Sequence, residues 1–202
     1  MSLVDRQHGP AMPPDTHLPN TSLPSTTQST AAEFAEAVGR AVLAWQDVEL
    51  RCAHLYVWLL DARNAQGALT SFHAVHALNV RAMMLKSAAH HMFQSPDFED
   101  LAEEFANLMD QLGECSRFRN RLTHSEVSEE LTDAGWAYAL KASALDTAAA
   151  GFVRGSGSKA GGRTKLPPID FPALKAAEGQ FRALAEGLHG FEEQLRERLE
   201  SL

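Results

Sequence analysis

Apolar side chains recur at steps of three and four residues over four long stretches of this chain, and that spacing limits the folds open to it. The stretches cover residues 30–64, 70–94, 97–123 and 171–200. A step of three or four residues places side chains on one face of an α-helix. In the first stretch the apolar set is Phe34, Val38, Val42, Trp45, Cys52, Leu55 and Leu59. We therefore predict an all-α protein, in which four amphipathic helices pack as an antiparallel four-helix bundle.

Local signals mark where three of these helices begin. Thr30 and Glu33 have the spacing of a capping box, in which each side chain accepts a hydrogen bond from the other residue's backbone N–H. Ser95 is followed by a proline and an aspartate, which favour the first turn of a helix. Asp170 precedes a helix with Pro172 in its first turn. These caps agree with the starts that the apolar spacing indicates.

The remaining parts of the chain do not have the helical pattern. Residues 1–29 contain five prolines among Ser, Thr, Gln and His, so we expect a disordered N-terminal tail. In the segment 125–169, Trp136, Tyr138 and Leu140 alternate with small residues as in a short strand, and Phe152-Val153 is a candidate partner strand. The prediction is one helical domain, 30–202, that carries a hairpin and a flexible loop as an insertion at 125–169.

A glycine-rich part of this insertion, from Gly157 to Thr164, nearly matches a phosphate-binding P-loop. That loop requires a lysine where Arg163 stands, and a helix whose N-terminus faces the phosphates. Leu166 is followed instead by two prolines, which do not begin a helix in this context. Nucleotide hydrolysis is therefore excluded, and the segment is interpreted as a loop with a few basic residues.

Charge and composition exclude several classes of protein. A formal net charge of −8 gives no global basic field, so we expect no DNA partner, and any site for RNA must be local. No run of eighteen apolar residues and no secretory signal pattern occurs, which predicts a cytoplasmic protein without a membrane partner. Cys52 and Cys115 occupy apolar helix positions and are interpreted as reduced core residues. His73 and His76 lack further ligands nearby, so neither a metal nor another cofactor is expected.

The polar exception to these patterns is the end of the third predicted helix. Arg117, Arg119 and Arg121 lie within five positions, Asn120 stands between two of them, and His124 follows at the expected helix end. Cations at a helix C-terminus stabilise its free carbonyls by about 0.3–1 kcal/mol each. Helix capping alone is therefore one explanation of this cluster.

The same residues also resemble a known motif. Arg119-Asn120-Arg121-Leu122-Thr123-His124 is similar to the R-x(4–6)-H motif of the HEPN superfamily (higher eukaryotes and prokaryotes nucleotide-binding). The first helix, with Trp45 and Glu49, also resembles that of bacterial members. The resemblance covers residues 30–124, and the last helix more loosely. It implies an all-α bundle that acts as a dimeric, metal-independent endoribonuclease, in a toxin or defence role with a small antitoxin-like protein partner.

The resemblance also implies roles for individual residues. Arg119 and His124 would be catalytic, and Asn120 would orient them or the phosphate. Arg117 and Arg121 would contact the RNA backbone. On an ideal helix, five steps of about 100° separate Arg119 and His124 by about 140°, so one protomer does not easily close a site around one phosphate. We therefore expect a homodimer in which two histidines and two arginines share one cleft.

Two alternatives to the nuclease remain open from the sequence. One is a non-catalytic module of the same family that binds a partner protein or a nucleotide. The other is a plain helical bundle, whose arginines only cap a helix. Glu49, one turn after Trp45, is interpreted as a carboxylate at the rim of the core, because buried unpaired acids are rare.

Overall fold

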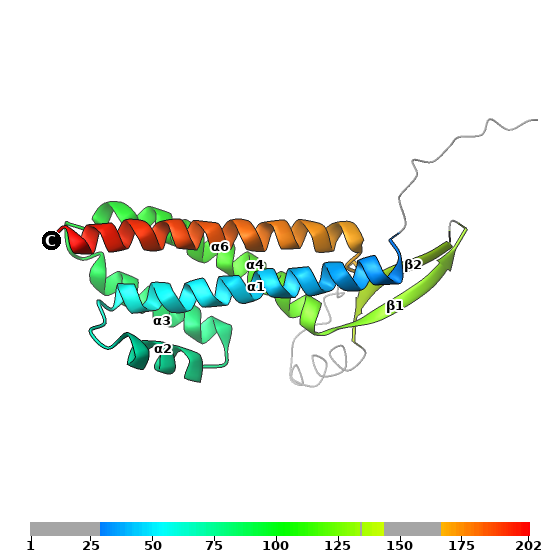
Figure 1. Ribbon diagram of the computed structural model, residues 1–202, viewed down its shortest axis with the longest axis horizontal. Coiled ribbons are helices and arrows are strands. Elements are labelled where there is room, and N and C mark those ends of the chain that lie inside the picture. The colour runs from blue at the N-terminus through cyan, green and yellow to red at the C-terminus, as the bar shows by residue number, and fades with distance from the viewer. Residues whose placement is uncertain (1–28, 134, 144–166) are drawn as a thin grey trace, which may run out of the picture.

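The computed structural model describes residues 29–133, 135–143 and 167–202 (Figure 1). This part of the chain is mostly helical, with one two-stranded antiparallel sheet. Its elements are α1 (Ala31–Leu59), α2 (Ala65–Ala74), α3 (Leu78–Met92), a 3-10 turn (Glu99–Leu101), α4 (Ala102–Thr123), β1 (Ser125–Thr132), β2 (Gly135–Ala142) and α6 (Phe171–Glu200). The mainly helical fold is as predicted. The N-terminal tail, except for its last residue, lies outside the described residues, and so do Phe152-Val153 and the glycine-rich loop.

Two predicted helix starts have the expected caps. Thr30 and Glu33 form the capping box at the start of α1, where the Glu33 backbone N–H donates to the Thr30 hydroxyl. The Thr30 backbone N–H donates in return to the Glu33 carboxylate. At the start of α6, the carboxylate of Asp170 accepts from the Ala173 backbone N–H at 2.9 Å. These bonds satisfy donors that the first turn of a helix leaves free.

The second predicted helix is wrong as a single element, because the chain forms two helices there. α2 ends at Ala74, and α3 begins at Leu78 after three residues that are not helical. Arg81 stabilises the break: its Nε donates to the Val75 carbonyl at 2.6 Å, and its guanidinium lies 5.5 Å from the centre of the Phe72 ring. The side chain thus supplies a donor to a carbonyl that the interrupted helix leaves without one.

The extra reversal changes the direction of the later helices. α1 and α6 run parallel and side by side, since Arg40 pairs with Glu178 near their starts and Trp58 contacts Glu192 near their ends (Figure 1). α4 runs antiparallel to α6, as the contact between Glu104 and Gln194 at one end indicates. The expected antiparallel four-helix bundle is therefore not confirmed: the described part of the chain has five α-helices, and α1 and α6 are parallel.

The core lies between α1, α4 and α6. Trp45 packs its ring edge-on against Phe181 at 5.2 Å between centroids, and Phe118 contacts the same ring at 6.2 Å. Cys52 and Cys115 are both buried and free, in agreement with their interpretation as core residues. Burial raises the pKa of the Cys52 thiol to about 12, so this thiol stays protonated and unreactive at neutral pH. Within the described residues, no helix combines the length and the apolar character that crossing a bilayer would need.

β1 and β2 form an antiparallel hairpin that extends past the start of α1 (Figure 1). The strand predicted from the alternation of Trp136, Tyr138 and Leu140 is β2. Within the described residues its partner is β1, directly after α4. The proposed Phe152-Val153 partner lies outside the described residues. At the base of the hairpin, Leu140 and Ile169 exchange backbone hydrogen bonds of 2.8 and 2.9 Å. These bonds fix the hairpin to the residues that precede α6.

Candidate functional site

The arginine-rich motif forms the C-terminal turn of α4, as expected. The last helical residue is Thr123, and His124 follows with φ −106° and ψ 18° while its N–H still donates to the Asn120 carbonyl at 3.1 Å. The Thr123 hydroxyl donates to the Arg119 carbonyl, and the Ser125 hydroxyl donates to that of Arg121. The Ser125 side chain therefore satisfies a carbonyl that the helix end would leave free. The chain turns into β1 immediately after the motif.

Arg119 lies against α1 and contacts the carboxylate of Glu49 on that helix. Its Nη2 is 4.0 Å from Oε1 of Glu49, and Nη1 of Arg81, from α3, is also 4.0 Å from this oxygen. The Trp45 indole N–H donates to the same atom at 3.0 Å. The Glu49 side chain is 28% exposed, so its interpretation as a rim carboxylate agrees with the structure. Two arginines share one carboxylate, which leaves this group of side chains with one net positive charge.

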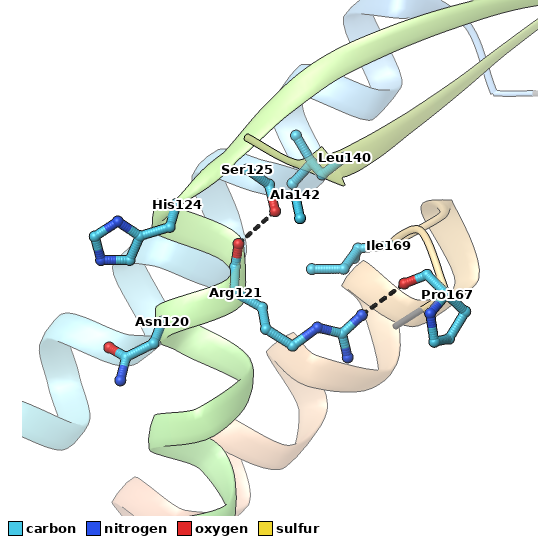
Figure 2. Close-up of a pocket in the computed structure, with 8 residues that line it drawn as sticks. All are labelled: Asn120, Arg121, His124, Ser125, Leu140, Ala142, Pro167 and Ile169. Carbon is cyan, nitrogen blue, oxygen red and sulfur yellow. Dashed lines mark hydrogen bonds between the residues drawn. The ribbon is translucent and has the colours of Figure 1, made fainter. Parts of the chain in front are cut away.

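Arg119 also contacts its neighbour in the motif. Its Nη1 donates to Oδ1 of Asn120 at 3.2 Å. Because the amide oxygen is used, the amide nitrogen of Asn120 remains the donor that it can offer to a ligand. Asn120 and His124 are both exposed, and their side chains point to the same side of α4 (Figure 2). Their four-residue spacing on the helix is the reason.

A cavity of about 270 Å³ lies beside this helix end. Its lining comes from α4, the base of the hairpin and the segment before α6, and consists of Asn120, Arg121, His124, Ser125, Leu140, Ala142, Pro167 and Ile169. Arg121 crosses it, and its Nη2 donates to the Pro167 carbonyl at 2.7 Å (Figure 2). The guanidinium also lies 5.8 Å from the centre of the Phe118 ring. Arg121 therefore connects α4 to the segment that precedes α6.

The structure brings only some of the motif residues together. Asn120, Arg121 and His124 line the cavity, whereas Arg119 does not and instead contacts Glu49. Arg117 is highly exposed and has Glu114 3.9 Å away. The expected divergence of Arg119 and His124 therefore agrees with their different surroundings. Arg81 and the residues at 167–169 were missed, because their place beside the motif follows from tertiary packing alone.

The arrangement can bind an anion and can transfer a proton. Arginine donors bind phosphate oxygens strongly, and a histidine ring nitrogen can accept or donate a proton. Among the described residues, no group of three or more His, Cys, Asp or Glu side chains is placed to hold a metal ion. No family model, curated protein or solved structure matches this chain.

Proposed function

We propose that this protein is a metal-independent endoribonuclease of the HEPN type, with Arg119 and His124 as its catalytic residues. The observation that carries the proposal is the exposed end of α4. There Asn120 and His124 face the same side, and Arg119 donates to the Asn120 side chain. A phosphate at this end would meet a guanidinium, an amide N–H and an imidazole. A toxin or defence role, in the cytoplasm, is part of the same proposal.

The proposed reaction is a transesterification at phosphorus. A neutral histidine takes the proton of a ribose 2′-hydroxyl, and the 2′-oxygen then forms a bond to phosphorus. The bond between phosphorus and the 5′-oxygen breaks, and a protonated histidine gives its proton to that leaving oxygen. The products are a 2′,3′-cyclic phosphate and a free 5′-hydroxyl. Arg119 binds the phosphate and stabilises the negative charge that grows on its oxygens.

The excess of positive charge at the Arg119 group suits this role. Glu49 attracts both Arg119 and Arg81, which holds the two guanidinium groups near each other despite their repulsion. One carboxylate offsets only one of the two cations, so an incoming phosphate is still attracted. Arg117 and Arg121 add positive charge at the same helix end and would contact neighbouring phosphates. A local basic site can thus bind RNA although the whole chain carries −8.

The second histidine of the reaction would come from a second copy of the chain. Exposed apolar side chains near the Arg119 group offer surface for such a dimer. Leu50 follows Glu49 on α1, Val80 precedes Arg81 on α3, and both are partly exposed. Leu43, one heptad before Leu50, is 64% exposed. Because Glu49 and Arg81 contact each other, these apolar residues flank the same ion pair. A two-fold axis beside it would place two copies of the α4 end near each other.

Arg119→Lys is expected to lower RNA cleavage by about 10²-fold or more, the size of effect that loss of one preorganised transition-state donor typically has. Lysine keeps the charge but loses the planar group that donates to two oxygens at once. The measurement is the initial rate on single-stranded RNA in EDTA. Arg182→Lys is the matched control, because this exposed arginine lies on α6 and contacts Glu178 within its own helix. Unchanged cleavage by Arg119→Lys would argue against the proposed role.

A further inference from the structure

One face of the hairpin is mostly apolar. The register pairs Val127 with Leu140, Glu129 with Tyr138, and Leu131 with Trp136. Residues opposite each other in an antiparallel pair project to the same face, and so do alternate residues of one strand. These six side chains therefore share one face, which holds a single charged group, Glu129, and no basic residue.

Two side chains of this face, both on β2, are covered, and three others are exposed. Leu140 is buried, and the ring of Tyr138 lies 6.1 Å from that of Phe34 at the start of α1. Val127 is 62% exposed, Leu131 is 68% exposed and Trp136 is 54% exposed. Three large, exposed apolar side chains on one face of a two-stranded sheet form a patch of the kind that marks an interaction site. Isolated hairpins are marginally stable, and a third strand or a packed partner normally supports them.

The backbone of β1 also offers free hydrogen-bonding groups on its outer edge. In the described part of the chain, the sheet has only the strands β1 and β2, so one edge of β1 has no neighbouring strand. Leu140 uses both its N–H and its carbonyl to bind Ile169, on the side of β2 away from β1. Its pair with Val127 is therefore a non-hydrogen-bonded pair, and the N–H and carbonyl of Val127 point outward as well. By the same alternation, the backbone groups of Glu129 and Leu131 also point outward.

The charge of this edge defines what can bind it. β1 carries Glu126, Glu129 and Glu130 and no basic residue, and the hairpin's single lysine, Lys141, pairs with Glu130 on the opposite face. Charged residues on an edge strand normally prevent association with other strands. Acidic residues do not prevent the approach of a basic strand. They favour it, and they repel a second copy of the acidic β1.

We propose that β1 binds an extended, basic segment of a partner protein, which adds to the sheet as a third strand. The outward groups of Val127, Glu129 and Leu131 would form the backbone hydrogen bonds. Side chains of the added strand opposite these three would share their face. The segment would therefore carry apolar, basic and apolar residues at alternate positions, over Val127, Glu129 and Leu131 respectively. Val127, Glu129 and Leu131 do not line the cavity beside His124, and the proposal does not depend on catalysis.

A synthetic peptide provides the test on the full-length chain. The probe is a fluorescein-labelled peptide with valine, lysine and valine at alternate positions between threonines, and the control peptide has glutamate in place of lysine. Binding is measured by fluorescence anisotropy at low and high salt. We expect the lysine peptide to bind, to lose affinity with salt, and to bind better than the glutamate peptide by about tenfold or more. Trp136 should become less accessible to acrylamide in the complex.

Substitutions in β1 separate backbone pairing from simple attraction between charges. Val127→Pro removes an N–H that points away from β2, so the hairpin should remain intact, because edge positions tolerate proline. We expect this variant to bind the lysine peptide about tenfold or more weakly than Val127→Ala, which lacks the same side chain but keeps the N–H. Leu131→Asp should weaken binding by a similar factor, whereas Leu60→Asp, at an exposed leucine just after α1, should leave it unchanged. Glu129→Lys should weaken binding of the lysine peptide more than Glu103→Lys, which makes the same charge change at an exposed position of α4.

Two results would overturn the proposal. Equal binding of the lysine peptide by the Val127→Pro and Val127→Ala variants would show that the edge of β1 is not used. A dimer in light scattering that dissociates on Leu131→Asp but not on Leu43→Asp would assign the apolar face to a second copy of this chain.

Discussion

His124→Ala is expected to lower RNA cleavage by about 10²–10⁴-fold, the usual effect of removing a general acid–base group. The side chain is exposed at the end of α4, and alanine there removes no core packing. The loss should therefore appear in the rate and not in the free energy of unfolding. The measurement is the initial rate on a fluorogenic RNA, with unfolding in urea as the check on folding. His91→Ala, at an exposed histidine of α3, should retain full activity.

Mixtures of the two proteins test whether the histidines of two protomers share one cleft. If each active cleft needs both copies of His124, a dimer with one wild-type and one His124→Ala protomer is inactive. After exchange in an equal mixture, roughly a quarter of the dimers are fully wild type, from random pairing in a two-fold assembly. The activity should then be about half that of the same two proteins assayed without exchange. Activity that stays proportional to the wild-type fraction would argue against a shared cleft.

Phe181→Ala is expected to lower the free energy of unfolding by about 3–5 kcal/mol, the usual cost of truncating a buried phenylalanine. Phe181 is fully buried on α6 and contacts the rings of Trp45 on α1 and Phe118 on α4. The cavity would therefore open where all three helices meet. Urea denaturation measures the change, and Leu60→Ala, at an exposed leucine just after α1, should change it by about 0.5 kcal/mol or less. A loss below about 1 kcal/mol for Phe181→Ala would contradict the packing described here.

The same substitution should also affect the site. Trp45 contacts Phe181 through its ring and donates its indole N–H to Glu49. Glu49 in turn lies beside Arg119. Loss of the Phe181 ring removes the support of Trp45 and so loosens the group of side chains around Arg119. We expect reduced cleavage by this variant even under conditions where it remains folded.

The periodicity of apolar residues predicts the helices whose packing is regular along their length. α6 covers the predicted range 171–200, and α4 ends at the predicted residue 123. The predicted start of the third helix at 97 is wrong, because a 3-10 turn at Glu99–Leu101 comes first and α4 begins at Ala102. The break between α2 and α3 has no such signal, since neither glycine nor proline occurs at residues 75–77. It depends on Arg81, whose side chain binds the Val75 carbonyl and Phe72 after the chain has folded back. A tertiary contact of this kind is invisible to local spacing.

In the hairpin and the site, too, local spacing predicts some features, whereas others depend on tertiary contacts. Alternation in β2 identifies a strand, whereas β1 has glutamates between and beside Val127 and Leu131, which hides its apolar face in the sequence. At the site, the spacing of four residues predicts that Asn120 and His124 share a side of α4. The contact of Arg119 with Glu49 joins residues far apart in the chain, and so does the contact of Arg121 with Pro167. These contacts require the packed helices, so the sequence alone does not locate them.

The chemistry of the RNA ends tests the central proposal most directly. A single-stranded RNA is incubated with the protein in EDTA, beside a copy of the RNA in which each cleaved nucleotide lacks its 2′-hydroxyl. We expect fragments with a 2′,3′-cyclic phosphate and a 5′-hydroxyl from the first RNA, and no cleavage at the modified nucleotides of the second. Fragments with a 3′-hydroxyl and a 5′-phosphate, cleavage that stops in EDTA, or no cleavage of any RNA would contradict it.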